Sequence, residues 1–159
     1  MKEFQRELST AKMKMLSYKS LGFFAYLLFN LKVFPDAKTE TVKTNGIDIF
    51  INPDWFMQLD ADSRVYVLLH ATMHVALQHP SRMQNRQEKL WMAASDLTVN
   101  LALHDYEVKL PKDALINTDY RNKTTEKIYE HLLELQKDGE EPPEPDHDDL
   151  VKPPLNPNK

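Results

Sequence analysis

The sequence predicts an α+β domain that is mostly helical and carries a small β-hairpin or sheet packed beside one long apolar helix. Several segments repeat apolar residues at helical spacing, which predicts the helices. One segment, residues 39–51, instead alternates apolar and polar residues after an Asn-Gly pair, which predicts two short strands. A chain of 159 residues is long enough for one domain with one core.

Two helices are predicted at the N-terminus. Apolar residues recur at helical spacing over residues 4–16, and residues 21–32 are too many and too rich in Leu for a strand. The apolar run at residues 21–31 is about half of the roughly 20 residues that cross a membrane, and it lies too far inside the chain for a signal peptide. We therefore expect a buried helix there.

The hairpin is predicted over residues 39–51, with Asn45-Gly46 at its turn. Four further helical segments are expected: a short turn over residues 54–59, a long apolar helix capped within Asp60–Ser63 and ended by Pro80, a second long helix over about residues 88–104, and an amphipathic helix from Thr124 or Thr125 to about Lys137.

We expect the domain to span residues 1–136 and residues 137–159 to form a disordered linker or tail. Six of the ten prolines fall between Pro142 and Pro157, among many acidic residues. A chain that stops within such a segment is expected to continue into a further domain.

The composition excludes several function classes. The chain has no cysteine, which rules out disulfides and thiolate metal sites, and its three glycines leave no phosphate-binding Gly-rich loop. The net charge of −4 comes from acidic residues near the C-terminus, so no basic surface predicts a nucleic-acid partner. No membrane partner is expected, and without a targeting segment the expected compartment is the cytoplasm.

The segment HATMH, from His70 to His74, lies in the middle of the most apolar predicted helix. Residues four apart lie one turn apart on one helix face, so the two imidazoles can converge on one ion. The HExxH zinc motif uses this spacing, with the Glu beside the first His as general base. Here that position holds Ala71.

Asp96 is the predicted third ligand, because it is a carboxylate on an otherwise apolar helix and an unpaired buried carboxylate is costly. Asn100, one turn later, could orient a ligand. His79 is the alternative third ligand, although it can reach the site only if the helix breaks before Pro80. Two alternatives need no metal. The His70–His74 spacing can arise by chance, and Asp96 can be a buried residue that only forms hydrogen bonds.

The stretch from Thr44 through Tyr129 resembles the putative metallopeptidase domain, zincin-like, that often precedes a von Willebrand A-like domain in bacterial and phage proteins. The resemblance rests on four segments in the family's order: TNGIDIFINPDWF, RVYVLLHATMHVALQHP, LWMAASDLTVN and LPKDALINTDYRNKTTEKIYEHL. It implies metal ligands at His70, His74 and Asp96, a peptide or protein substrate, and a von Willebrand A-like domain as a partner. The family has Glu where this sequence has Ala71.

The predicted function is therefore that of a zinc peptidase whose catalytic activity is very low because Ala71 replaces the general base. The missing base normally accepts a proton from water and passes it to the leaving amine, and a methyl group can do neither. The alanine could be natural or introduced. Zn²⁺ is the expected cofactor, although two His and one Asp also suit iron, cobalt or nickel. The alternative function is a non-catalytic metal-containing protein-binding module.

Overall fold

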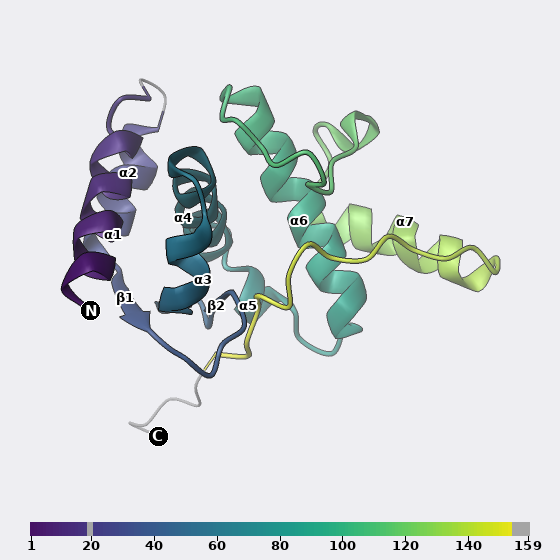
Figure 1. Ribbon diagram of the computed structural model, residues 1–159. Helices are drawn as coiled ribbons and strands as arrows, with labels where there is room; N and C mark the ends of the chain where they lie inside the picture. The colour runs from purple at the N-terminus through teal and green to yellow at the C-terminus, as the bar shows by residue number, and fades with distance from the viewer. Residues whose placement is uncertain (19–20, 154–159) are drawn as a thin grey trace. The chain divides into compact units, whose positions relative to one another are not determined.

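The computed structural model describes residues 1–18 and 21–153 (Figure 1). Within these residues it contains seven α-helices, one 3-10 helix and a three-stranded mixed sheet, which confirms the α+β class. The chain divides into two compact units. Of the described residues, the first unit comprises those within Met1–Arg82 together with residues 149–153, and the second comprises Met83–Asp148.

The first unit is built around the helix α4, against which α1 and α2 pack. The buried face of α1 comes from apolar side chains at helical spacing, beginning with Phe4 and Leu8, as expected. The helices of this unit are α1 (Lys2–Met15), α2 (Gly22–Asn30), α3 (Pro53–Gln58), α4 (Ala61–Ala76) and α5 (His79–Arg82).

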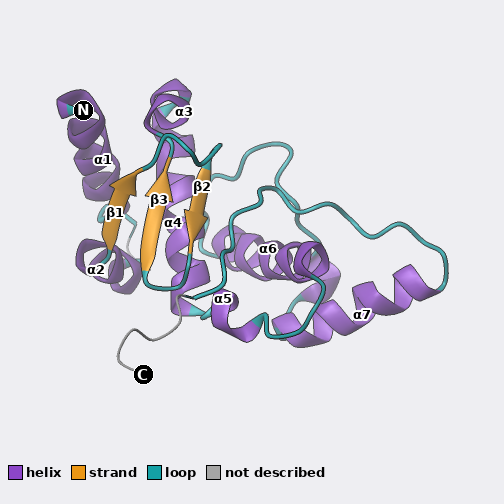
Figure 2. Cartoon of the chain, turned by 90° about the horizontal axis from the view of Figure 1, so that it is seen from below, coloured by secondary structure: helices purple, strands orange, loops and turns teal. Residues whose placement is uncertain are grey.

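The sheet of the first unit has the order β1-β3-β2 and packs beside α4 through β2 (Figure 2). Its strands are β1 (Lys32–Pro35), β2 (Val42–Thr44) and β3 (Asp48–Ile51). β1 runs parallel to β3, and β2 runs antiparallel to it. The predicted second helix wrongly included Lys32: α2 ends at Asn30, and the β-branched and aromatic residues that precede Pro35 favour a strand.

The hairpin between β2 and β3 is confirmed, and its turn follows from Asn45-Gly46. The Asn45 Oδ1 atom accepts hydrogen bonds from the backbone N–H of Ile47 (2.9 Å) and of Asp48 (2.8 Å). Gly46 has φ = +90°, a conformation that an L side chain rarely adopts. The turn therefore depends on these two residue types.

The C-terminal segment of the chain pairs with the free side of β2. The Thr44 N–H donates to the Asp149 carbonyl (2.8 Å) and the Val151 N–H donates to the Thr44 carbonyl (2.9 Å), which makes a parallel bridge centred on Leu150. Asp149 and Leu150 are buried. Residues 154–159 of the predicted tail lie outside the described residues.

The long helix α4 begins where the sequence predicts and ends earlier. Asp60 caps it by accepting a hydrogen bond from the Ser63 N–H (2.7 Å). We expected Pro80 to end the helix, but α4 ends at Ala76 because Gln78 adopts a left-handed conformation with φ = +55°. Pro80 instead lies in the first turn of α5, where its missing N–H costs nothing.

The second unit contains α6 (Glu88–Asp105), the 3-10 helix η1 (Thr118–Tyr120) and α7 (Thr125–Lys137). α7 packs along α6, and Thr124 caps it through a hydrogen bond from the Lys127 N–H (3.2 Å). None of the described helices is both long and apolar enough to cross a membrane.

Candidate metal centre

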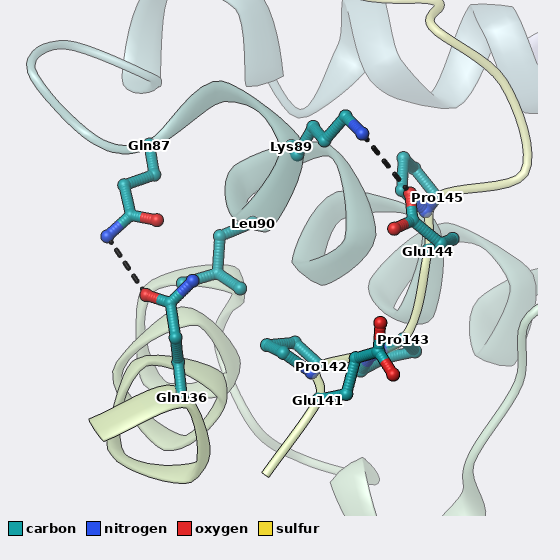
Figure 3. Close-up of a pocket in the computed structure, with 9 residues that line it drawn as sticks. All are labelled: Gln87, Lys89, Leu90, Gln136, Glu141, Pro142, Pro143, Glu144 and Pro145. Atoms are coloured by element: carbon teal, nitrogen blue, oxygen red, sulfur yellow. Dashed lines mark hydrogen bonds and ion pairs between the residues drawn. The ribbon is translucent and has the colours of Figure 1, made fainter. Parts of the chain in front are cut away.

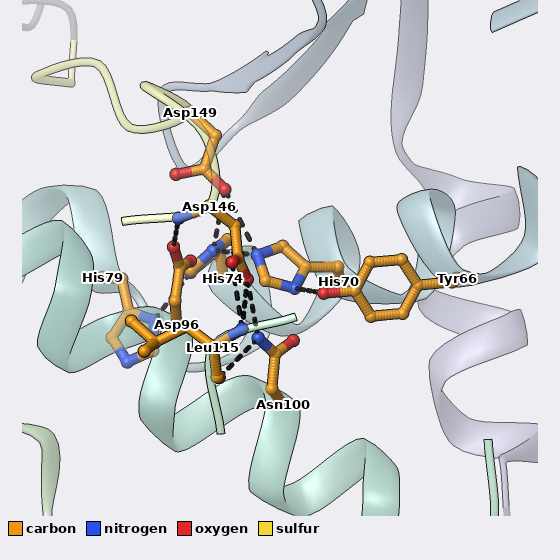
Figure 4. A network of polar contacts seen from close by, with 9 residues as sticks. All are labelled: Tyr66, His70, His74, His79, Asp96, Asn100, Leu115, Asp146 and Asp149. Atoms are coloured by element: carbon orange, nitrogen blue, oxygen red, sulfur yellow. Dashed lines mark hydrogen bonds and ion pairs between the residues drawn. The ribbon is translucent and has the colours of Figure 1, made fainter. Parts of the chain in front are cut away.

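His70 and His74 lie one turn apart on α4, and both are buried. Their Nε2 atoms are 2.9 Å apart. Two nitrogens at this distance can share only one hydrogen, so at least one Nε2 atom keeps its lone pair toward the other ring. The sequence prediction that the two imidazoles converge on one point is met by this geometry (Figure 4).

Asp149 brings a carboxylate to the same point from the C-terminal segment (Figure 4). Its Oδ2 atom lies 3.0 Å from His74 Nε2 and 3.3 Å from His70 Nε2. The side chain is buried, and neither carboxylate oxygen has a hydrogen-bond partner of acceptable geometry. Each of the three residues offers a ligand atom, all within 4.8 Å of one another, as in a cation site.

The charge of Asp149 fits a cation at this point. Burial by itself would raise the pKa of Asp149, but attraction to His74 and His70 outweighs burial, so the pKa lies below its ordinary value. The carboxyl group is therefore ionised at neutral pH. A buried, ionised carboxylate needs a cationic or hydrogen-bonding partner, and a metal ion with the two imidazoles as co-ligands is one such partner.

The opposite edge of each imidazole is held by a second side chain. His70 Nδ1 lies 3.1 Å from the Tyr66 hydroxyl, and His74 Nδ1 lies 2.9 Å from His79 Nδ1. Burial lowers the pKa of His79 well below its ordinary value, so the neutral imidazole is favoured. Its Nδ1 atom can then accept a hydrogen bond from His74.

These contacts are compatible with the tautomer that a metal ligand needs. When Nδ1 of His74 donates to His79, its Nε2 atom is left with a lone pair, and Nδ1 of His70 can likewise donate to the Tyr66 hydroxyl. Metal-binding histidines commonly have such a partner on the other ring nitrogen. The break between α4 and α5 lets His79 approach, but it lies at the Nδ1 edge of His74 and not at the edge that faces Asp149.

Ala71 follows His70 on α4 and is buried. Its methyl group cannot accept or pass on a proton. The candidate centre therefore has metal-ligand atoms within this unit, but the side chain at position 71 cannot act as a general base.

In the second unit, Asp96 and Asn100 both lie buried on α6, one turn apart. The Asp96 Oδ2 atom accepts a hydrogen bond from the backbone N–H of Asp146 (2.8 Å), and the Asp146 carboxylate accepts one from Asn100 Nδ2 (2.8 Å) (Figure 4). Asn100 Nδ2 also donates to the Leu115 carbonyl (2.8 Å). Asn100 thus supports Asp96 through Asp146.

A pocket of about 280 Å³ in the second unit has a different character (Figure 3). Lys89 and Glu144 on its wall form a loose exposed ion pair (3.7 Å), and Gln87 donates to Gln136 (3.1 Å). Its remaining lining is mainly the proline-rich segment Glu141–Pro145. These side chains make no cluster that is typical of a metal or catalytic site.

Sequence reasoning missed Asp149 and Tyr66. Asp149 stands in an acidic, proline-rich stretch that was assigned to the tail, and the usable signal was the apolar pair Leu150-Val151 directly after it. Tyr66 stands four residues before His70, the spacing that places side chains on one helix face.

The family model of the putative metallopeptidase domain matches residues 3–153 of the chain. The match covers both units and includes the C-terminal segment that carries Asp149. No curated protein and no solved structure gives a significant match.

Proposed function

The chain belongs to the putative metallopeptidase domain family, and from this premise we propose that it binds one zinc ion in a site descended from a peptidase centre. The observation that carries the proposal is the arrangement of His70, His74 and Asp149. Two imidazole Nε2 atoms and one buried carboxylate face a single point, with the carboxylate oxygen 3.0 Å and 3.3 Å from the two nitrogens.

We propose Asp96 as a further ligand of this zinc ion. The support comes from the sequence resemblance and from the chemistry of a fully buried carboxylate on an apolar helix. Asn100 and Asp146 would then keep the carboxylate in place from within their own unit.

A bound zinc ion would supply Lewis acidity for peptide-bond hydrolysis by activating a water and polarising the scissile carbonyl. The protein's part is to hold the donors: Tyr66 and His79 fix the two imidazoles, and the burial of the site excludes bulk water. The step that this chain cannot perform is proton transfer at position 71, because Ala71 has no titratable group. We infer very low peptidase activity for the sequence as it stands.

A non-catalytic, metal-containing binding module is the second candidate function. The buried methyl group of Ala71 favours it, because a binding module needs the metal and the fold but no base. Both candidate functions require the metal site. They are distinguished by whether introducing a general base at position 71 produces peptide hydrolysis.

The residues that fix the imidazoles give the first test. Replacing His79 with Ala is expected to weaken zinc binding by about 10- to 100-fold, because His74 loses the partner that holds its tautomer, and Tyr66→Phe should act in the same direction. Competition with a chromophoric zinc chelator measures the affinity. Tyr120→Phe is the matched control, since it removes an exposed Tyr–His contact to His131. If His79→Ala and Tyr66→Phe both bind zinc as tightly as this control, the assigned orientation of the site is wrong.

A further inference from the structure

The C-terminal segment Asp149–Val151 pairs with the edge of β2 through an isolated parallel bridge between Thr44 and Leu150. Its two backbone hydrogen bonds, 2.8 Å and 2.9 Å long, both go to Thr44. Extended peptides bind proteins by this kind of pairing, in which backbone hydrogen bonds hold the strand and side chains enter adjacent sites. Here the side chain that enters a site is Asp149.

Asp149 lies on the imidazole pair because of this pairing. The Asp149 carbonyl accepts from the Thr44 N–H, while its carboxylate lies 3.0 Å from His74 Nε2. The Asp149 carbonyl and the Val151 N–H, which form the two hydrogen bonds, lie on either side of Leu150, and Leu150 is buried. The strand and the carboxylate are therefore placed together, so displacing one removes the other.

A catalytic zinc ion normally has three protein ligands and one position left for water or substrate. The donors that we proposed above are four: His70, His74, Asp96 and Asp149. The Asp149 carboxylate is then a fourth donor, and it is carried by a strand that pairs as an extended peptide would. A peptide that paired with the edge of β2 in the same register would have to displace Asp149–Val151.

We propose that Asp149–Val151 is an internal, substrate-like strand that blocks the peptide-binding edge of β2 and the open metal position. This inference rests on the proposed zinc site. The ligand expected at the edge of β2 is an extended peptide segment. Such a peptide can reach this edge and the metal site only after the C-terminal segment is released.

The test uses acetohydroxamate, a small metal-binding probe, titrated calorimetrically into the zinc-loaded full chain and its variants. Val151→Pro removes the N–H that donates to Thr44 and leaves Asp149 in the sequence. Val151→Ala is the matched control, because it keeps that N–H and trims a partly exposed side chain. Zinc content and circular dichroism are measured for each protein.

The expected result is weak hydroxamate binding by the unmodified protein and by Val151→Ala, and binding at least about tenfold tighter by Val151→Pro, with zinc still bound in all three proteins. Two results would overturn the inference: hydroxamate binding by Val151→Pro that is no tighter than by Val151→Ala, or equally tight hydroxamate binding by the unmodified protein. Absence of zinc from the unmodified protein would instead refute the proposed function, and this inference would fall with it.

Discussion

Replacing Ala71 with Glu in the zinc-loaded protein is expected to raise peptide hydrolysis by about 10²- to 10⁴-fold, the usual contribution of a positioned general base. The substitution restores the residue that the HExxH pattern places directly after the first histidine. Cleavage of fluorescently labelled unfolded protein and of mixed peptides measures the rate. If the C-terminal strand blocks access, the gain will be larger when Ala71→Glu is combined with Val151→Pro.

Ala71→Gln is the control for this gain, because it has nearly the same shape as Ala71→Glu but no carboxylate to accept a proton. Circular dichroism shows whether either variant disturbs the fold, since position 71 is buried. A folded, zinc-loaded Ala71→Glu protein that cleaves no faster than Ala71→Gln, with and without Val151→Pro, would contradict a peptidase ancestry. The non-catalytic binding module would then be the better assignment.

Replacing His74 with Ala is expected to abolish stoichiometric zinc binding while the helices remain folded. His74 supplies one of the two convergent Nε2 atoms and is also the residue that contacts both His79 and Asp149. In the absence of zinc, the fold of the first unit is held by the packing of α1 and α2 on α4 and by the sheet, so metal loss should not unfold it. Zinc content and far-ultraviolet circular dichroism are the measurements.

His104→Ala is the matched control, since this histidine is exposed near the end of α6 and belongs to no candidate site. An unfolded His74→Ala protein, with His104→Ala unaffected, would indicate a structural metal site and count against the catalytic-type site. Full retention of zinc by His74→Ala would remove His74 from the ligand set.

The sequence predicted the parts of the fold that depend on local patterns. Asp60 and Thr124 cap their helices as expected, because a side-chain oxygen at that position satisfies a backbone N–H of the first turn. The Asn45-Gly46 turn likewise needs only those two residues. The end of α4 was mispredicted, because it depends on the left-handed backbone of Gln78, for which the sequence has no Gly signal.

The candidate site was predictable where its residues lie on one helix. His70 and His74 are brought together by the helical repeat alone. Asp149 was not predictable in this way, because its place depends on pairing of a distant segment with β2, and acidic proline-rich sequence normally remains solvated. His79 was recognised, but its contact with His74 depends on the end of α4 at Ala76, which is earlier than the end that Pro80 predicts.

The most direct test of the zinc site is elemental analysis of the protein, purified without added metal, beside its Asp96→Ala and His79→Ala variants. The account predicts about one zinc per chain in the unmodified protein, its loss from Asp96→Ala, and its retention, with weaker affinity, by His79→Ala. Absence of metal from the unmodified protein, even after incubation with zinc, would contradict the central claim and leave His70, His74 and Asp149 as a buried hydrogen-bonded cluster.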